Sequence, residues 1–374
     1  MRYANTLHYD LQWVNPERLR KLDDGSFAWK GERMKAIRLA RLYERAGYPD
    51  YAERVESCAT WLSFYVLGDR RSLQSANFCK LRLCPMCVAR GARVRAQLLS
   101  KVMDAVQNEH KCQYIFLTLT IQNVPGDKLG EAMSQLTKGW ARLLDQRPVK
   151  RAVQGWFRAI EITRHNKPGE WHGTYHPHIH AILAVEDGYF RRKNGLYLTK
   201  DDIIARWRKA MRLSYDPSVK INKTYDRKRK GAKPHSDDEA SSGAVLEAAK
   251  YATKDSDYIS DRLSDDEAVQ IVKDYTSALY RRRLTAFGGW FKDVAARLKV
   301  PDFDNVDLTD GDDRIRADLA EMIEEYGWHV GAGDYVLADR FINPLRVKRD
   351  AGHEAGIQEG VTLDRNGGGE HGAE

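Results

Sequence analysis

The chain has 374 residues, of which 42% are hydrophobic and 30% are charged, and its formal net charge is +8 at pH 7. This length and apolar content suffice for two or three domains with a core, and they argue against general disorder. No apolar stretch is long enough to span a bilayer and the first residues show no signal-peptide pattern, so we expect a soluble, cytoplasmic protein with no membrane partner.

The charge is unevenly distributed along the chain. Residues 301–374 contain 18 acidic and 7 basic residues, a net charge of −11, so residues 1–300 carry +19. A body this basic indicates a polyanionic partner, above all nucleic acid, although a basic surface without such a partner is the alternative. The acidic part is either a solubilising tail or a segment that competes with DNA for the basic body.

The N-terminal part shows helical periodicity. Apolar residues at helical spacing predict a helix over residues 32–47, which ends at a glycine, and a second, basic helix over residues 91–107. We therefore expect an N-terminal helical region over residues 1–57 and a cysteine-rich segment with a basic helix over residues 58–112.

The five cysteines form an odd set, which argues against a disulfide framework in a cytoplasmic chain. In "FCKLRLCPMC", Cys79, Cys84 and Cys87 are separated by four and then two residues, and 20 residues lie between Cys58 and Cys79. Four thiolates form the closed tetrahedral ligand set of a structural zinc site. We expect these four to bind one Zn²⁺, with buried free thiols as the alternative, and Cys112 to be an ordinary thiol.

From residue 113 onward, strand-like and helix-like segments alternate. Four segments have the alternation or the short apolar runs of strands, and four have helical periodicity. The predicted strands are residues 113–123, 155–165, 175–185 and 218–226, and the predicted helices are residues 127–146, 200–213, 243–260 and 264–284. The second and third strands suggest an antiparallel hairpin with a long loop, and residues 285–293 suggest a glycine-containing turn.

Three histidines alternate at the start of the third strand, in "YHPHIHAILAV". His176, His178 and His180 therefore share one face, which is costly at the entrance of an apolar strand unless they share a metal. Hairpin pairing can place Glu161 of the preceding strand beside His178 and His180. Two imidazoles and a carboxylate suit a catalytic divalent ion such as Mg²⁺ or Mn²⁺, and His176 is the alternative third ligand.

A polar stripe follows in "LEAAKYATKDSDY". Glu247, Tyr251, Lys254 and Tyr258 are spaced by four, three and four residues, which aligns them along a predicted helix. Tyrosine can attack phosphorus covalently, Lys254 can supply positive charge, and Glu247 can act as a general base. The alternative is that both tyrosines pack in the core and that Glu247 pairs with a lysine.

These segments resemble a known family. The chain is similar to the rolling-circle plasmid replication initiators of the HUH endonuclease superfamily, in the group that pairs a tyrosine with a glutamate. The resemblance covers roughly residues 58–292, and the order and spacing of several motifs make it specific. The motifs are "ANFCKLRLCPMC" at residues 76–87, "FLTLTIQN" at 116–123, "HPHIH" at 176–180 and "KYATKDSDY" at 250–258, with Glu247 before the tyrosine.

The resemblance implies an α+β fold with a central antiparallel sheet that carries the HxH metal site and is flanked by helices. In this organisation an HUH nuclease domain spans residues 113–300, an acidic C-terminal region spans 301–345, and a disordered tail is expected over 346–374. The helical region and the four-cysteine zinc segment precede the nuclease domain.

The resemblance also implies the activity, which is site- and strand-specific nicking of a plasmid double-strand origin. His178 and His180 would hold the metal, Tyr251 would become joined to the 5′ phosphate, and the free 3′ hydroxyl would prime synthesis. Glu247 would support the final cleavage at termination. Host helicase and DNA polymerase are the implied partners, the origin DNA is single-stranded or extruded at the nick, and a homodimer is compatible with the pattern.

Two other functions remain open at this point. A transposase or relaxase would use the same nuclease chemistry, and Tyr258 as a second nucleophile would favour a two-tyrosine mechanism of that kind. A zinc-containing, non-catalytic DNA-binding regulator would need neither the carboxylate nor the histidines on facing strands.

Overall fold

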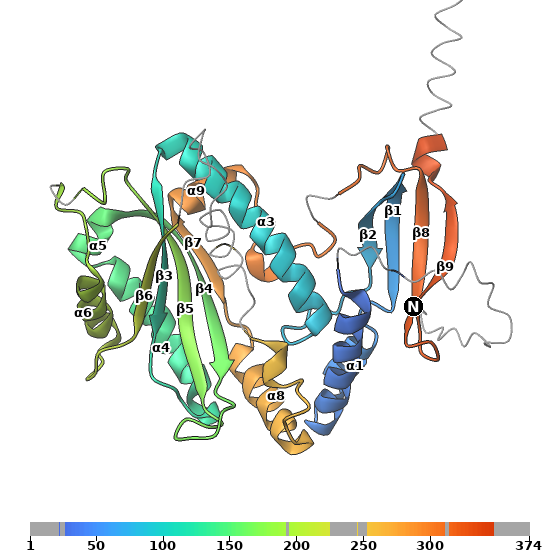
Figure 1. Ribbon diagram of the computed structural model, residues 1–374, viewed down its shortest axis with the longest axis horizontal. Helices are drawn as coiled ribbons and strands as arrows, with labels where there is room; N and C mark the ends of the chain where they lie inside the picture. Colours follow the sequence, from blue (N-terminus) through green and yellow to red (C-terminus); the bar gives the residue numbers. More distant parts are fainter. Residues whose placement is uncertain are drawn as a thin grey trace, which may run out of the picture. The chain divides into compact units, whose positions relative to one another are not determined.

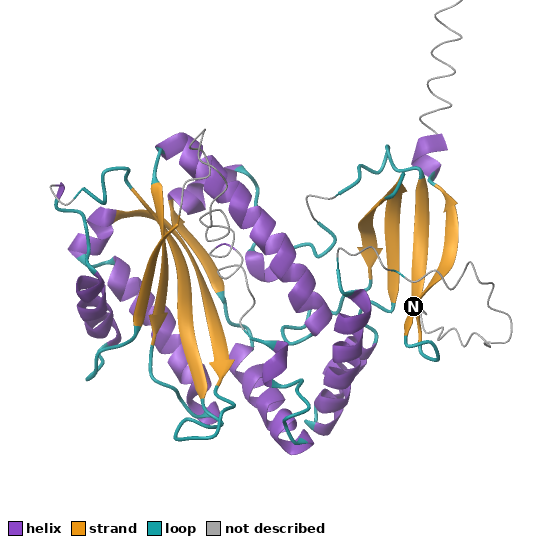
Figure 2. Ribbon diagram, in the orientation of Figure 1, coloured by secondary structure: helices purple, strands orange, loops and turns teal. Residues whose placement is uncertain are grey.

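The computed structural model describes residue 22 and residues 27–191, 194–224, 245, 253–310 and 314–347. Within these ranges the chain forms two antiparallel sheets with helices around them (Figures 1 and 2). The expected α+β class with antiparallel sheets is therefore confirmed. Glu247, Tyr251 and the tail from residue 348 onward lie outside the described residues.

Contacts group the chain into two compact units that interleave along the sequence. One unit comprises residues 1–30, 59–77 and 312–374, and the other comprises residues 31–58 and 78–311. The domains expected from the sequence are consecutive segments, and their boundaries remain a proposal.

The smaller unit is built on a four-stranded sheet in the order β2-β1-β8-β9. Its strands are β1 (Trp61–Leu67), β2 (Arg70–Ala76), β8 (Met322–His329) and β9 (Asp334–Ile342). Phe64 and Tyr326 pack edge to face at 5.8 Å between ring centroids, and the buried carboxylate of Glu324 accepts a hydrogen bond from Arg71 Nε at 2.7 Å. Part of the acidic C-terminal region thus forms half of this sheet, which the sequence analysis did not predict.

The larger unit contains a five-stranded sheet in the order β6-β3-β5-β4-β7. Its strands are β3 (Gln113–Thr120), β4 (Val153–Arg164), β5 (Tyr175–Val185), β6 (Val219–Thr224) and β7 (Thr285–Gly289). All neighbouring strands are antiparallel, and the histidine strand β5 is central. The predicted hairpin of the second and third strands corresponds to β4 and β5.

Helices cover both faces of this sheet (Figure 1). The helices on one side are α4 (Gly126–Leu144), α5 (Arg147–Ala152) and α6 (Lys200–Met211), and those on the other are α3 (Pro85–His110) and α9 (Trp290–Arg297). Trp207 of α6 donates its indole N–H to the carbonyl oxygen of Thr120 at 2.9 Å. On the opposite face, the hydroxyl of Tyr114 donates to the carbonyl oxygen of Met103 in α3 at 2.6 Å.

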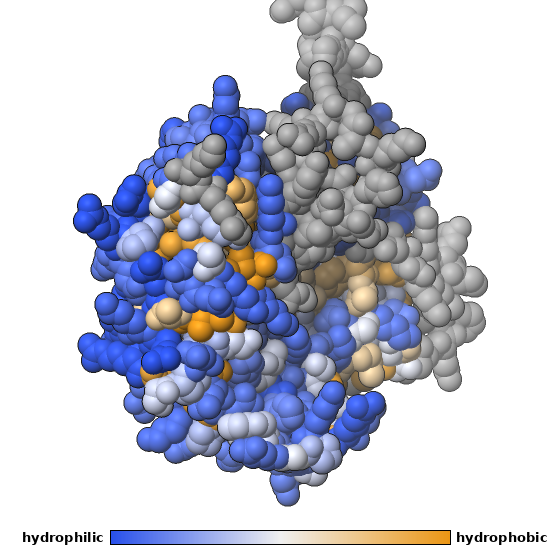
Figure 3. All heavy atoms as spheres, turned by 60° about the vertical axis from the view of Figure 1, so that its left-hand side comes forward, coloured by the Kyte–Doolittle hydropathy of each residue, from blue (hydrophilic) through white to orange (hydrophobic). Residues whose placement is uncertain are grey.

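Further helices of the described residues lie near the N-terminus and from the second half of the tyrosine motif onward. They are α1 (Trp29–Arg45), α2 (Pro49–Glu56), α8 (Asp265–Leu279) and the short 3₁₀ turns η4 (Asp255–Asp257) and η5 (Phe303–Asn305). A capping box of Ser264 and Glu267 begins α8, because each side chain accepts from the other residue's backbone N–H. The described residues contain no helix whose length and apolar character would allow it to cross a membrane, and the face drawn in Figure 3 is mostly hydrophilic with small apolar patches.

The turn predicted over residues 285–293 is wrong. Its first half is the edge strand β7, which pairs with β4, and its second half begins α9. The glycines that suggested a turn are required by close packing: a Cβ on Gly288 would lie 2.2 Å from the Trp156 ring, and Gly289 has φ +53°. Glycine inside a strand therefore marks close approach of a neighbour here rather than a chain reversal.

The helix predicted over residues 243–260 is wrong in its C-terminal part. Lys254 has an extended backbone, with φ −97° and ψ 132°, and the single 3₁₀ turn η4 follows it. Lys254 and Tyr258 therefore do not lie on one α-helical stripe. Aspartate carboxylates compete with helical hydrogen bonding, and the carboxylate of Asp257 instead binds the hydroxyl of Tyr275.

Candidate functional site

Strand register brings one carboxylate and two imidazoles together on the central strands. Glu161 of β4 lies directly opposite His178 of β5, and His180 follows two residues later on the same face. The hairpin pairing expected from the sequence therefore places Glu161 beside both histidines. This cluster lies on the sheet face that also carries the ring of Phe116, which stacks on His180 with 5.5 Å between centroids.

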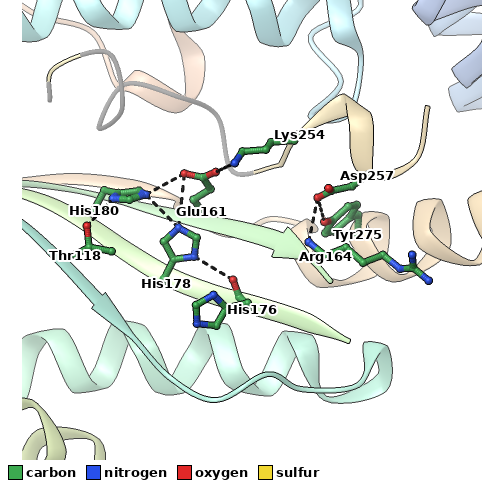
Figure 4. Close-up of polar contacts among 9 residues, drawn as sticks. All are labelled: Thr118, Glu161, Arg164, His176, His178, His180, Lys254, Asp257 and Tyr275. Atoms are coloured by element: carbon green, nitrogen blue, oxygen red, sulfur yellow. Dashed lines mark hydrogen bonds and ion pairs between the residues drawn. The ribbon is translucent and has the colours of Figure 1, made fainter. Parts of the chain in front are cut away.

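The three side chains converge on a small volume (Figure 4). Nε2 of His180 lies 3.0 Å from Oε2 of Glu161, and Nε2 of His178 lies 3.7 Å from the same oxygen. The two Nε2 atoms are 3.1 Å apart. All three residues are buried, with relative exposures of 3% for Glu161, 7% for His178 and 6% for His180.

The outer ring nitrogens of both histidines have partners. Nδ1 of His178 lies 3.0 Å from the backbone carbonyl oxygen of His176, and Nδ1 of His180 lies 3.2 Å from the hydroxyl of Thr118. A carbonyl oxygen only accepts, so Nδ1 of His178 is the donor in this contact, and Nε2 is the ring nitrogen that faces the cluster. The hydroxyl of Thr118 can donate or accept, so it orients the His180 ring, and the set of two Nε2 atoms and one carboxylate oxygen fits a divalent metal ion.

Electrostatics keep Glu161 ionised. Burial by itself raises the pKa of this carboxyl, but hydrogen bonds and charge interactions with His178 and His180 outweigh burial and hold the pKa well below its usual range. Nζ of Lys254 lies 3.4 Å from Oε1, the other carboxylate oxygen, and its side chain is 47% exposed. The site therefore presents a buried anion with a partly exposed cation at its rim.

His176 lies at the edge of the cluster. Its ring is tilted against that of His178 at 5.3 Å and, in Figure 4, points away from Glu161. The side chains that come within ligand distance of one another are those of Glu161, His178 and His180. His176 contributes its backbone carbonyl, and burial followed by the nearby charge of His178 lowers the pKa of its ring.

Of the four residues in the predicted polar stripe, Lys254 and Tyr258 are described. Lys254 reaches Glu161, whereas Tyr258 is fully buried and its hydroxyl donates to the backbone carbonyl oxygen of Leu83 at 2.5 Å. Burial raises the pKa of Tyr258 well above its ordinary value, so the hydroxyl stays protonated. These features do not suit a second nucleophile.

The four cysteines form a second cluster. Sγ of Cys58 lies 3.5 Å from Sγ of Cys87 and 3.6 Å from Sγ of Cys84, and Sγ of Cys79 lies 3.7 Å from Sγ of Cys87. A tetrahedral zinc ion with Zn–S bonds of about 2.3 Å separates its sulfur ligands by about 3.8 Å. The arrangement therefore fits Zn²⁺, and Cys112 is buried elsewhere, with its Sγ 3.8 Å from Oε1 of Gln107.

The local backbone supports thiolates at this cluster. The amides of Cys79, Lys80 and Leu81 point at cluster sulfur atoms at 3.3–3.5 Å, and Lys80 makes the tight turn with φ +57°. Hydrogen bonds with the other three sulfur atoms lower the pKa of Cys79, whereas contacts with Cys58 and Cys79 are the main cause that raises the pKa values of Cys84 and Cys87. Full ionisation of all four thiols therefore requires a cation in their midst.

Known proteins similar to this chain share one description. The profile of a family described as "Replication protein" matches residues 70–336. A "Protein rep" of Bacillus amyloliquefaciens is 34% identical over 325 residues, which cover 83% of this chain and 93% of that protein. Another "Protein rep", from Streptococcus pneumoniae serotype 2, is 35% identical over 283 residues, covering 75% of this chain and 82% of the relative. The chain belongs to this family of replication proteins.

Family membership confirms the resemblance to rolling-circle plasmid replication initiators. The matched residues include the triad, Lys254 and three of the four cysteines, while Cys58 precedes the matched range. The match also favours a replication protein over the transposase or relaxase alternative. No solved structure matches the chain significantly.

Thr118 is the residue that sequence reasoning missed. The alternation of "FLTLT" places it on one face of β3, but only the register with β5 puts it opposite His180. A small hydroxyl residue on a strand next to a histidine strand is a weak signal, because many such threonines simply pack. Its contact with Nδ1 of His180 identifies it as the partner that orients this ring.

Proposed function

We propose that this replication protein initiates rolling-circle replication by nicking one strand of a plasmid double-strand origin. The observation that carries the proposal is the convergence of Glu161, His178 and His180, with the cation of Lys254 at its edge. A chain that only bound DNA would have no need for a buried carboxylate between two imidazoles, because burying such a group without a partner is costly. Family membership supplies the substrate class, plasmid origin DNA.

Glu161, His178 and His180 would hold a divalent ion such as Mg²⁺ or Mn²⁺. When bound, this ion would withdraw charge from the scissile phosphate. Thr118 and the carbonyl of His176 orient the two imidazoles, so the ligand atoms need no rearrangement. Lys254 adds positive charge on the side of the site where its side chain is partly exposed.

Tyr251 is the proposed nucleophile. Its phenolic oxygen gives up its proton and forms a bond to phosphorus, the bond from phosphorus to the 3′ oxygen breaks, and the 3′ oxygen takes up a proton to become the primer hydroxyl. The phosphotyrosine conserves the energy of the phosphodiester, so rejoining needs no nucleotide triphosphate. The target strand must be single-stranded or extruded, because the phosphate has to reach a site between packed elements.

Glu247 is proposed to act at termination. A carboxylate activates water or supports the last cleavage, and so closes the cycle without leaving protein attached to the product. Host helicase and DNA polymerase would extend the 3′ end in between, and a homodimer would allow two sites to act at one origin.

The four cysteines are proposed to bind one structural Zn²⁺. Their sulfur spacing fits a tetrahedral ion, and the turn at Lys80 aims backbone amides at the sulfur atoms. A closed set of four thiolates leaves no open position for substrate, so this ion would stabilise the fold and would not take part in cleavage.

Nicking of supercoiled plasmid that carries the cognate origin tests the proposal. The wild-type protein with Mn²⁺ should give open circles with one mapped nick and protein attached to the 5′ end, and mass spectrometry should locate the link on Tyr251. Tyr251→Phe should give neither nick nor adduct. Glu247→Ala should nick and form the adduct but release few monomeric circles from a two-origin plasmid.

Each alternative gives a different result in the same assay. Binding to origin DNA without any nick would support the non-catalytic regulator. An adduct that persists in Tyr251→Phe would move the nucleophile to another residue, and normal termination by Glu247→Ala would remove the role of Glu247.

A further inference from the structure

The segment that includes the second half of the tyrosine motif is held from several sides. We call residues 253–261 the anchor segment. It begins with Thr253 and the extended Lys254, continues through the 3₁₀ turn η4, and contains the buried Asp257 and Tyr258. A short segment without a regular helix has few backbone hydrogen bonds of its own, so its position depends on its side-chain contacts.

Helix α1 makes the outermost contacts with the anchor segment. Nζ of Lys35 lies 2.6 Å from the Asp255 carboxylate, and the guanidinium of Arg38 donates to the carbonyl oxygen of Ser260 at 3.1 Å. These groups are partly exposed, so solvent screens the ion pair and its contribution is small. The firm attachment must come from the buried contacts.

Asp257 attaches the anchor segment to β4 and α8. Its Oδ2 accepts hydrogen bonds from the hydroxyl of Tyr275 at 2.7 Å and from the backbone amide of Arg164 at 3.2 Å (Figure 4). Arg164 is three residues from Glu161 on the same strand. A buried carboxylate held by two donors is a directional contact that fixes the segment against the strand carrying the metal-site carboxylate.

Tyr258 attaches the same segment to the cysteine loop. Its hydroxyl donates to the carbonyl oxygen of Leu83, the residue before Cys84, and its ring packs edge to face near Tyr275. The residue is fully buried, so this hydrogen bond is not in competition with water. The cysteine loop and the metal triad are thereby joined through five consecutive residues, 254–258, from the Lys254 contact with Glu161 to the Tyr258 contact with Leu83.

We infer that Asp257 and Tyr258 are positioning residues that hold Lys254 at Glu161 and connect this contact to the four-cysteine loop. The inference rests on the proposed function. A lysine side chain with 47% exposure has many rotamers, and only a fixed backbone places its Nζ 3.4 Å from the Glu161 carboxylate in a reproducible way. The sequence did not predict this positioning role, because the spacing of the polar stripe made Tyr258 a candidate nucleophile.

The position of Lys254 has a consequence that can be measured without DNA. Its positive charge beside Glu161 opposes a divalent cation bound by the same carboxylate, and it also favours the negative charge that builds up on phosphate during cleavage. Loosening the anchor segment should therefore tighten Mn²⁺ binding, by about threefold. It should also slow nicking, by about tenfold.

The test compares two deletions of a buried tyrosine hydroxyl. Tyr258→Phe removes the bond to Leu83 and keeps the ring, and Tyr335→Phe is the matched control, because Tyr335 is also buried and donates to a backbone carbonyl, that of Ala59, at 2.7 Å in the other compact unit. Binding of Mn²⁺ alone is measured by electron paramagnetic resonance of the full-length protein. Single-turnover nicking is measured on origin plasmid.

We expect Tyr258→Phe to bind Mn²⁺ more tightly and to nick more slowly than Tyr335→Phe. In a Lys254→Ala background, adding Tyr258→Phe should change neither quantity further. Equal behaviour of the two phenylalanine variants would overturn the inference, as would a further loss of nicking in the Lys254→Ala background. Absence of nicking by the wild type would instead refute the proposed function, and the Mn²⁺ measurement would still decide the role of Tyr258.

Discussion

At the scale of single residues, the site is defined by the groups that compensate the negative charge of the buried Glu161 carboxylate. Glu161 has two imidazoles on one carboxylate oxygen and the Lys254 cation near the other. Thr118 and the carbonyl of His176 contact the outer ring nitrogens, and the inner nitrogens converge on Glu161. A buried carboxylate beside two imidazoles lowers the stability of the fold unless cations compensate its charge. Such a cluster is typical of a metal site.

The histidine assignment gives a prediction with a built-in control. His178→Ala should lower Mn²⁺-dependent nicking by at least about 100-fold, because it removes one inner ligand of three. Its affinity for origin DNA, measured by fluorescence anisotropy without added metal, should stay close to wild type. His176→Ala should lose far less activity, since its ring points away from the cluster. If His176→Ala is inactive while Glu161→Gln is active, His176 is the third ligand.

The triad could be predicted from the sequence because its residues lie on two strands that are adjacent along the chain. Strand parity places His178 and His180 on one face, and a hairpin of two adjacent strands can be paired with Glu161 without any knowledge of the rest of the chain. Thr118 and Asp257 could not be assigned in the same way. Their roles depend on the β3–β5 register and on contacts with α8, which join residues 62 and 18 positions apart.

At the scale of elements, local periodicity predicted the strands β3, β4, β5 and β6. It failed for segments whose secondary structure depends on tertiary packing. The strand β7 was mistaken for a turn because its glycines accommodate the Trp156 ring. Strands β1 and β8 pair although some 250 residues separate them, and the adjacent charged residues Glu324 and Glu325, of which Glu324 is buried, conceal the alternation of β8. The prediction of a helix through Lys254 was wrong because Asp255 and Asp257 bind partners on other elements.

The cysteine loop and the start of α3 form an element whose stability can be tested. Cys84 is the N-cap residue of α3 and Cys87 lies in its first turn, so one ion would fix both the loop and the helix start. Cys84→Ser should lose zinc by elemental analysis and lower the stability by about 3 kcal/mol or more, roughly 6–12 °C in melting temperature for a unit of this size.

Cys112→Ser is the matched control for that prediction, because Cys112 is buried but lies outside the cluster. It should keep one zinc per chain. Freshly purified wild-type protein without zinc, never exposed to a chelator, would contradict the assignment of the four-cysteine cluster.

At the scale of the whole molecule, charge is divided along the chain rather than balanced locally. Residues 1–300 carry +19 and residues 301–374 carry −11. A replication protein must find one origin among many other DNA sites, and a strongly basic body binds all of them through phosphate contacts. The acidic part therefore either keeps the chain soluble or weakens this non-specific binding by occupying the basic surface, and the two roles differ in what its removal does.

Deletion of residues 348–374 distinguishes these roles. The segment contains six acidic and three basic residues, so its removal raises the formal net charge from +8 to +11. If it competes with DNA, the truncated protein should bind non-origin DNA several-fold more tightly at about 50 mM salt, and the difference should shrink at about 200 mM, where phosphate contacts weaken. Equilibrium binding to a labelled non-origin duplex across this salt range measures the effect. Unchanged affinity together with lower solubility would assign the segment a solubilising role instead.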